Sequence, residues 1–361
     1  MVLLLILGQF PVAAATRRRA VQHPSAPVPP EAIVTAARQA AEAALKAGAP
    51  AVQIAVSHRG RVVYSEAFGL SDKESATAAT PRSVMQVGSI TKTFTAAAVL
   101  RLAERGALTL DDPVEKHVPE FNPPGEATVT LRHVLTHTSG MNTPLPPLYS
   151  PLTREQFMKA INAQPPEFTP GSKFSYSNGA YKLLGFAIES ITGTSFADYV
   201  HTELALPLGL VDTGVCGTAG LPVPDGYGLL QGTLTRIPAG HMSVAFSAGA
   251  LCSTASDLTR WSYLLATGRV MLPASYETMI TPGTLSNNTL TPYGLGVFVG
   301  KMLGYPTVSH TGGTPGFQSS LIYFSDQEIA VAAIVNTSPA PAGVDAHFIA
   351  LNVAGAALAS L

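Results

Sequence analysis

The chain has 361 residues, of which 46 % are hydrophobic and 12 % are charged, and its formal net charge is −1. This balance supports a sizeable buried core and excludes an intrinsically disordered protein. No run of Lys and Arg is placed to follow a phosphate backbone, so the sequence argues against nucleic acid as a partner.

The first fifteen residues form an apolar run that ends in three alanines. A run of this length suits the core of a signal peptide and is too short to span a bilayer. We therefore predict a signal peptide at 1–15, export to the periplasm or the medium, and no stable membrane span in the mature chain. Three arginines follow the run and no Lys or Arg precedes it, so an ordinary apolar tail on a cytoplasmic protein is the alternative. Residues 16–30 include a proline-rich stretch and predict a linker.

The next elements alternate between helix and strand. Residues 31–47 are alanine-rich with helical spacing and predict a helix. Two short runs, 51–57 and 61–69, predict a β-hairpin. Apolar residues recur at intervals of three and four over 89–106, which predicts a helix that ends at a C-terminal glycine.

Helical patterns dominate the middle of the chain. From 111 to about 240, helices are expected between loops rich in Pro and Gly, and two of these helices are 155–163 and 179–192. Residues 256–267 predict a further helix with a Ser or Thr available as its N-cap. Strands are expected after Tyr293, followed by a final alanine-rich helix. Their ranges are 294–300, 317–324 and 329–336 for the strands and 344–358 for the helix.

Strands and helices at both ends of the chain indicate one sheet that is completed by N- and C-terminal pieces. We predict that 31–110 and 241–361 form an α/β domain. Residues 111–240 then form a mainly helical domain, and the site lies at the interface between the two. The chain has two cysteines, Cys216 and Cys252, and the sequence leaves open whether they pair or remain buried thiols.

Three short motifs, each of which occurs once in the chain, indicate chemistry. A single S-x-x-K arises often by chance, whereas three such motifs in this order are a stronger signal. They are S-x-x-K at Ser89 and Lys92, Y-x-N at Tyr176 and Asn178, and H-T-G at His310, Thr311 and Gly312.

The spacing of the first motif places a nucleophile beside a base. Positions i and i+3 of a helix share a face, so the Ser89 hydroxyl is expected beside the Lys92 amine. A serine attacks only when a base takes its proton, and burial favours the neutral lysine that this requires. Tyr176 is the second candidate for proton transfer, and the Asn178 amide is suited to hold Lys92 and a substrate carbonyl.

These residues resemble the motifs of the penicillin-recognising serine hydrolases: class C β-lactamases, serine D,D-peptidases, D-aminopeptidases and related esterases. The resemblance implies an α/β (α+β) fold of the β-lactamase/transpeptidase type, with an antiparallel sheet flanked by helices, an all-α insert and the site between them. It covers nearly the whole mature chain. The similar segments are 131–140, 170–178, 246–261, 293–296 and 310–317.

The same resemblance implies a role for each motif residue. Ser89 is acylated, Lys92 and Tyr176 share the proton transfers, and Asn178 orients its neighbours. The oxyanion hole consists of the backbone N–H groups of Ser89 and Gly313.

The resemblance extends to the H-T-G motif, with two departures. His310 takes a place often held by Lys and is expected near Tyr176, while Thr311 contacts a substrate carboxylate or carbonyl. A titratable His in place of a fixed charge weakens the case for a dedicated β-lactamase. Gly313 has no hydroxyl that could donate a hydrogen bond to a substrate carboxylate. The apolar, proline-rich segment 141–151 is expected near the mouth of the site, where it suits an ester or acylated substrate.

Each candidate has a structural alternative. Ser89 and Asn178 also suit helix caps, Tyr176 a core aromatic, and His310 the end of a strand. Ser247 lies in A-F-S-A-G, which lacks the first glycine of a nucleophile elbow, and we expect it to be structural. His133 and His137 are four residues apart, but no H-E-x-x-H motif is present, so we predict no metal and no cofactor.

The sequence therefore predicts a serine hydrolase that acts through an acyl-serine intermediate. The leading interpretation is a D,D-peptidase or weak β-lactamase, whose substrate is a small molecule or peptide with an amide or β-lactam bond. A carboxylesterase of the same fold, acting on short acyl esters, is the first alternative. A non-catalytic scaffold that binds peptidoglycan is the second.

Overall fold

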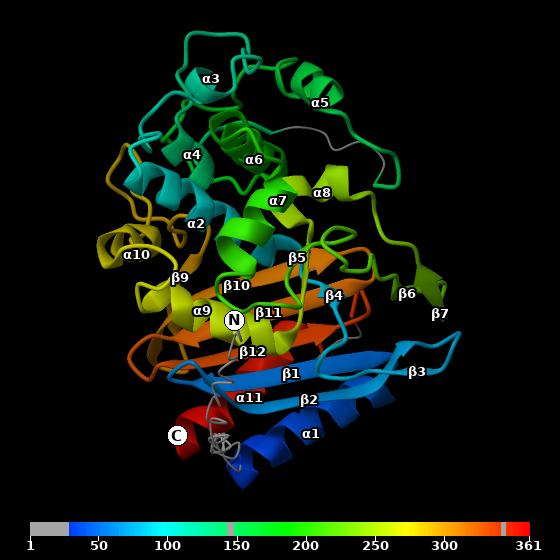
Figure 1. Cartoon of the computed structure of the whole chain (residues 1–361). Helices are drawn as coiled ribbons and strands as arrows, with labels where there is room; N and C mark the ends of the chain where they lie inside the picture. The colour runs from blue at the N-terminus through cyan, green and yellow to red at the C-terminus, as the bar shows by residue number, and fades with distance from the viewer. Residues whose placement is uncertain (1–28, 143–147, 341–343) are drawn as a thin grey trace, which may run out of the picture.

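A computed structural model describes residues 29–142, 148–340 and 344–361 of the chain (Figure 1). The expected signal peptide at 1–15 and all but the last two residues of the expected linker lie outside the described residues. Within the described ranges, no helix is both long enough and apolar enough to cross a bilayer.

A seven-stranded antiparallel sheet is the centre of the fold. Its strands are β1 Ala51–His58, β2 Arg61–Asp72, β3 Thr77–Ala78, β9 Phe298–Met302, β10 Tyr305–Thr314, β11 Phe317–Phe324 and β12 Ile329–Val335. The order is β3-β2-β1-β12-β11-β10-β9, so the N-terminal hairpin continues directly into the C-terminal strands. Val56 of β1 lies opposite Val331 of β12 in this central pairing. The prediction of one sheet completed by both ends of the chain is confirmed.

Both faces of the sheet are covered by helices. Side chains alternate between the two faces of a strand, so a strand buried on both faces is apolar throughout, as β12 is. Val331 and Ala333 pack with α1 (Glu31–Lys46) and α11 (Ala346–Ser360), whereas Ala332 and Ile334 join the core on the other side. Figure 1 shows α1 and α11 beneath the sheet, with α9 (Ala255–Ala266) and the remaining helices above it.

Several helices above the sheet begin at side chains that cap them. Thr153 accepts from Gln156 N at the start of α5, and Ser177 accepts from Ala180 N at the start of α6. The expected helices near 155–163 and 179–192 are confirmed with small shifts. The remaining helices are α2 Thr91–Glu104, α3 Val114–His117, α4 Leu131–Leu135, α5 Arg154–Ile161, α6 Asn178–Thr192, α7 Phe196–Tyr199, α8 Met242–Gly249, α10 Pro273–Ile280, the 3₁₀ turn η1 Gly88–Ile90 and the π-helical turn η2 Val200–Ala205.

A hairpin interrupts the region expected to contain only helices and loops. Its strands are β6 (Gly226–Leu230) and β7 (Thr233–Ile237). The two connecting residues, Gln231 and Gly232, both have positive φ, as the favoured two-residue hairpin turn requires. Gln-Gly is a weaker turn signal than Asn-Gly, which explains why the pattern did not indicate these strands.

The expected strand at 294–300 is wrong in its first half. Gly294 N donates to Val297 O at 2.9 Å and Gly296 has φ +80°, so these residues form a turn and β9 begins only at Phe298. The pattern also did not indicate β10, which carries the H-T-G motif, because its proline and its two adjacent glycines weaken the strand signal.

A small three-stranded sheet supports the segment before Ser89. It consists of β4 (Met85–Gln86), β8 (Leu251–Ser253) and β5 (Gly214–Val215), with β8 in the middle. Cys252 of β8 forms a disulfide with Cys216, which resolves the alternative that the sequence left open.

Candidate active site

Ser89 lies in the tight turn η1, directly before α2. Thr91 Oγ1 donates to Gly88 O at 2.6 Å and accepts from Leu251 N at 3.0 Å, so this turn is joined to β8. Gly88 has φ +49°, and a Cβ atom there would lie 2.7 Å from Gly313 N. Only glycine at position 88 therefore lets the turn lie against β10.

Lys92 follows one turn later, with its amine inside the protein. Its Nζ lies 3.0 Å from Ser89 Oγ, 2.7 Å from Asn178 Oδ1 and 2.7 Å from Ala248 O. The side chain is fully buried, and none of the ion pairs found among the described residues includes it. Burial lowers the pKa of Lys92 well below its ordinary value.

This geometry matches a neutral amine. A neutral lysine has two N–H donors and one lone pair, and the two carbonyl oxygens of Asn178 and Ala248 accept both hydrogens. The remaining contact, with Ser89 Oγ at 3.0 Å, takes the lone pair of this uncharged amine, whereas an ammonium would donate its third hydrogen there. Lys92 is thereby placed to accept the proton of the Ser89 hydroxyl.

Tyr176 lies on the other side of the amine. Its ring centroid is 4.8 Å from Lys92 Nζ. Burial raises the pKa of the Tyr176 phenol above its ordinary value, and a hydrogen bond with the Ser89 side chain opposes this only in part. Tyr176 therefore keeps its proton at neutral pH. The two candidates for proton transfer differ accordingly: Lys92 can accept a proton and Tyr176 can donate one.

His310 is close to Tyr176 but points inward. The two ring centroids are 6.3 Å apart. His310 Nδ1 donates to Thr311 O at 2.6 Å, and Nε2 accepts from the Tyr293 hydroxyl at 2.8 Å. Burial lowers the pKa of His310 to about 3. The imidazole is thus neutral, and both of its nitrogens are occupied by protein groups.

The rest of the H-T-G motif borders the site in different ways. Thr311 is exposed, while Gly312 is only partly so. A Cβ atom at Gly312 would overlap Val87 O, so this glycine allows β10 to approach the segment before Ser89. A Cβ atom at Gly313 would meet nothing within 4 Å, and Gly313 lines a cavity together with Ser89.

His137 is a site residue that the sequence reasoning missed. It is buried, has φ +57°, and its Nδ1 accepts from Ser177 N at 3.0 Å. Its ring centroid is 4.1 Å from that of Tyr176 and 4.8 Å from that of Tyr293. Burial lowers the pKa of His137 well below its ordinary value. A signal was present, because His137 lies in the 131–140 segment of the resemblance.

Two residues set aside in the sequence occupy structural positions. Ser247 is buried, and its hydroxyl donates to Tyr181 O at 3.1 Å. His133 Nδ1 accepts from Thr130 N in a helix cap. In the described part of the chain, no group of three or more His, Cys, Asp or Glu side chains is arranged to hold a metal ion.

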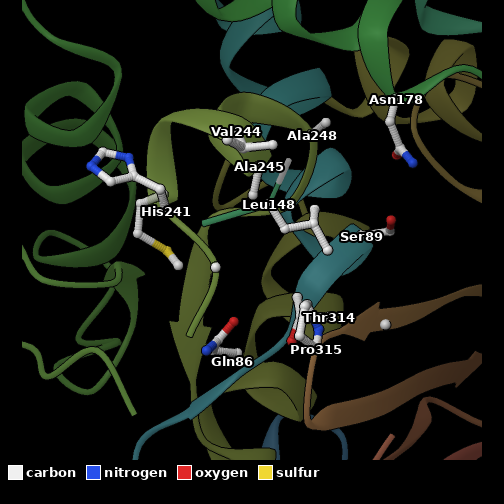
Figure 2. Close-up of a pocket in the computed structure, with 14 residues that line it drawn as sticks. Gln86, Ser89, Leu148, Asn178, His241, Val244, Ala245, Ala248, Thr314 and Pro315 are labelled. Carbon is white, nitrogen blue, oxygen red and sulfur yellow. The ribbon is translucent and has the colours of Figure 1, made fainter. Parts of the chain in front are cut away.

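A cavity of about 120 Å³ opens beside Ser89 (Figure 2). Asn178 and Gly313 line it together with Ser89, so three of the expected site residues meet at one opening. Lys92 and His310 are buried beside them, whereas the Tyr176 side chain is partly open to solvent. The structure therefore brings the three motifs together, whereas the role of each residue stays a prediction.

Comparison with known proteins gives a consistent result. The Beta-lactamase family model matches residues 33–354. The chain is 30 % identical over 264 residues to the putative penicillin-binding protein PbpX of Bacillus subtilis. This match covers 73 % of this chain and 64 % of that protein. The chain thus spans less than two thirds of the length of this relative.

Two solved structures are similar over most of the chain. One is a D-stereospecific amidohydrolase from a Streptomyces species, with 29 % identity, a TM-score of 0.73 and coverage of 87 % of this chain and 96 % of that one. The other is the octameric penicillin-binding protein homologue from Pyrococcus abyssi, with 27 % identity, a TM-score of 0.77 and coverage of 91 % and 78 %.

Proposed function

The chain belongs to the β-lactamase family, and we propose that it is a serine hydrolase that forms an acyl-enzyme on Ser89. One observation carries this proposal: the buried amine of Lys92 lies 3.0 Å from Ser89 Oγ and is held there by two carbonyl oxygens. A helix N-cap at Ser89 would need no such arrangement. A non-catalytic scaffold would not need it either.

The groups at the site suffice for a balanced acyl transfer. Lys92 Nζ takes the hydroxyl proton while Ser89 Oγ bonds to the substrate carbonyl carbon, whose oxygen becomes an oxyanion. The backbone N–H groups of Ser89 and Gly313 stabilise that oxyanion. The bond to the leaving group then breaks, and the Tyr176 phenol donates its proton to the leaving atom. The Lys92 ammonium returns a proton to the Tyr176 phenolate.

Hydrolysis of the acyl-enzyme repeats these steps with water. Lys92 takes a proton from the water, the water oxygen bonds to the acyl carbon, and the ester bond to Ser89 Oγ breaks. The serine regains a proton through Tyr176, and the carboxylic acid leaves. An acceptor alcohol or amine in place of water gives acyl transfer by the same route.

The proposed scissile bond is an amide, including that of a β-lactam or a D-amino-acid peptide. Support comes from the relatives, which are described as a putative penicillin-binding protein and a D-stereospecific amidohydrolase. An ester of a short acyl chain is the alternative. The observation that favours the ester is the position of His310, which presents no positive charge to a substrate carboxylate.

The test uses a chromogenic cephalosporin and nitrophenyl butyrate with wild type beside Ser89→Ala. We expect wild type to hydrolyse at least one of them, and Ser89→Ala to lose about 10³-fold or more in kcat. A protein that hydrolyses the ester but not the cephalosporin would reject the β-lactam as a substrate and favour the esterase.

Mass spectrometry after treatment with a fluorophosphonate tests the acyl-enzyme itself. We expect one adduct per chain, on Ser89. Wild type without any adduct would reject the proposed function and support the scaffold.

Export is a separate part of the proposal. It is supported by the apolar segment 1–15 and by the Cys216–Cys252 disulfide, since disulfides persist mainly in oxidising compartments. N-terminal sequencing of protein recovered outside the cytoplasm is expected to begin near residue 16. Full-length protein confined to the cytoplasm would contradict it.

A further inference from the structure

The cavity beside Ser89 has a mostly apolar lining. Most of its lining side chains are small or apolar, and they come from α8, from Leu148 and from the end of β10. The described lining residues include no Arg, Lys, Asp or Glu. They are Gln86, Ser89, Leu148, Asn178, Gly240, His241, Met242, Val244, Ala245, Ala248, Gly249, Gly313, Thr314 and Pro315.

The apolar part of the wall lies next to the nucleophile. Figure 2 shows the side chains of Leu148, Val244 and Ala245 gathered on one side of Ser89. The imidazole of His241 is directed away from Ser89 in the same view, and its Nδ1 is within 2.8 Å of Ser243 Oγ. A group attached to the substrate carbonyl carbon therefore meets hydrocarbon when it enters the cavity.

The size of the cavity limits what this group can be. Its volume is about 120 Å³. An apolar protein cavity of about 150 Å³ holds one benzene molecule, so this smaller cavity sets an upper limit of about a phenyl ring or a branched aliphatic chain for the part of the group inside it. A longer linear chain would have to leave through the mouth.

The electrostatics of the site work against an anionic group. A carboxylate in an apolar cavity loses its hydration and needs a paired cation or several hydrogen-bond donors. Lys92 is buried with all three of its polar contacts inside the protein, and His310 is occupied by Tyr293 and by the backbone. Gly313 supplies no hydroxyl.

We infer that this cavity receives the acyl group of the substrate, and that this group is neutral, apolar and no larger than a phenyl ring with a short linker. The substrates are then esters or amides of aromatic or branched aliphatic acids, and a carboxylate on the acyl group makes a substrate poor. The inference rests on the proposed function and names the substrate class of the same site.

The first test compares nitrophenyl esters that share one leaving group. From acetate to butyrate, kcat/KM is expected to rise about fourfold for each added CH₂ that is buried. Phenylacetate is expected to be the best of the series. The hydrogen succinate ester, similar in length to butyrate but charged, is expected to be at least tenfold poorer than butyrate. Equal kcat/KM for succinate and butyrate would overturn the inference.

Two substitutions at one position provide a matched test. Ala245 lines the cavity and is partly exposed, so a larger side chain can be accommodated there without unfolding. Ala245→Phe fills the cavity and is expected to lower kcat/KM for phenylacetate at least tenfold and for acetate less than threefold. Ala245→Arg adds a cation of similar size. The ratio of kcat/KM for the succinate ester to kcat/KM for the butyrate ester is expected to rise at least tenfold. If neither ratio changes, the cavity is not the acyl subsite.

A deletion pair adds a control for general effects. Leu148→Ala removes one apolar wall and is expected to reduce the preference for phenylacetate over acetate at least threefold. Leu290→Ala removes an equally large exposed leucine that does not line the cavity, and it is expected to leave this ratio unchanged. A change of the same size in both variants would contradict the assignment.

The outcomes separate this inference from the proposed function. Esters that turn over without discrimination, together with a fluorophosphonate adduct on Ser89, would reject the subsite and retain the serine hydrolase. A protein that hydrolyses no ester or amide and forms no adduct would reject the proposed function itself.

Discussion

The amine of Lys92 and the phenol of Tyr176 flank Ser89, and burial favours the uncharged form of both. Their ordinary pKa values are close together, so a solvent-exposed pair would offer no clear base at neutral pH. Desolvation separates them: the pKa of Lys92 falls and that of Tyr176 rises. The result is a base and an acid that both contact one hydroxyl.

The pH dependence of kcat/KM tests this separation. Lys92 acts as base only when deprotonated, and its lowered pKa makes the deprotonated form available at neutral pH. We expect a plateau from neutral pH to about pH 10, and a fall of up to tenfold per pH unit at acidic pH as Lys92 takes a proton. The raised pKa of Tyr176 predicts no alkaline fall below about pH 10. A tenfold rise in kcat/KM per pH unit between pH 7 and pH 9 would show that the pKa of Lys92 is not lowered.

His137 holds Tyr176 in place without reaching the reacting atoms. It accepts a hydrogen bond from Ser177 N, between Tyr176 and Asn178, and its ring packs on that of Tyr176. His137→Phe keeps a ring but leaves a buried N–H unpaired, which costs about 1–3 kcal/mol. Part of this cost is expected to appear as misplacement of the phenol, so kcat falls about tenfold or more while KM changes little.

His133→Phe is the matched control for this prediction. It also removes an imidazole nitrogen that accepts a backbone N–H, but in the cap of α4 and away from Ser89. We expect a lower midpoint of thermal unfolding and an unchanged kcat. An equal loss of kcat in both variants would show that His137 only stabilises the fold and does not position Tyr176.

Three helices meet around Lys92, and α8 contributes through a kink. Phe246 has φ +41° inside this short helix, a conformation that non-glycine residues rarely adopt. After the kink, Ala248 O accepts from Lys92 Nζ, and Ser247 O accepts from Thr95 Oγ1 at 2.7 Å. The strained residue thus places carbonyl groups toward α2 that a regular helix would direct along its own axis.

Helix α6 carries a second buried lysine whose amine has no partner among the described residues. Lys182 is 1 % exposed, its Nζ lies 5.2 Å from the centroid of the Phe157 ring, and burial lowers its pKa to about 8. Below that pH the folded protein carries an unpaired buried charge. The helix therefore includes a residue that opposes folding at neutral pH.

Lys182→Met is expected to raise the free energy of unfolding by about 3 kcal/mol at pH 7, because a shift of one pKa unit corresponds to about 1.4 kcal/mol. The unfolded chain binds more protons than the folded chain between pH 8 and 10.5, so wild type gains stability across this window. The advantage of the variant is expected to shrink accordingly. Urea unfolding at pH 7 and pH 10 measures both values.

The control replaces an exposed lysine on α5. Lys159→Met is expected to change the free energy of unfolding by less than about 0.5 kcal/mol at either pH. A Lys182→Met variant less stable than wild type at pH 7 would show that the amine has a partner in solution.

At the scale of the whole molecule, the disulfide joins two cysteines with a sequence separation of 36, and the stretch between them supplies one wall of the cavity. This stretch contains β6, β7 and α8. Its last residue, Cys252, pairs with Gln86 in the strand that leads to Ser89. The cross-link thus connects the cavity wall to the support of the nucleophile.

Replacing both cysteines with alanine is expected to lower the free energy of unfolding by about 2–4 kcal/mol, the usual value for a loop of this length. Dithiothreitol is expected to lower the urea midpoint of unfolding of wild type. It is expected to leave the midpoint of the Cys216→Ala/Cys252→Ala variant unchanged. Wild type whose midpoint does not respond to complete reduction would contradict this.

Local patterns in the sequence were sufficient for much of the fold. The helix at 31–47, the hairpin after it and the apolar strands near the C-terminus have strong periodic signals, and all are confirmed. The elements that were missed or misplaced are β6, β7, β9 and β10, and all but β7 contain Gly, which is depleted in strands. Their strand conformation depends on pairing with neighbours rather than on local propensity.

The sequence by itself determined the nucleophile motif and its family resemblance, because S-x-x-K on one helix face is a local property. The tertiary structure alone decided the environment of Lys92, since burial lowers its pKa and carbonyl groups from α6 and α8 hold its amine. It also paired His310 with the hydroxyl of Tyr293 and packed the ring of His137 against that of Tyr176. These features depend on contacts between distant segments, and the spacing of residues in one segment carries no information about such contacts.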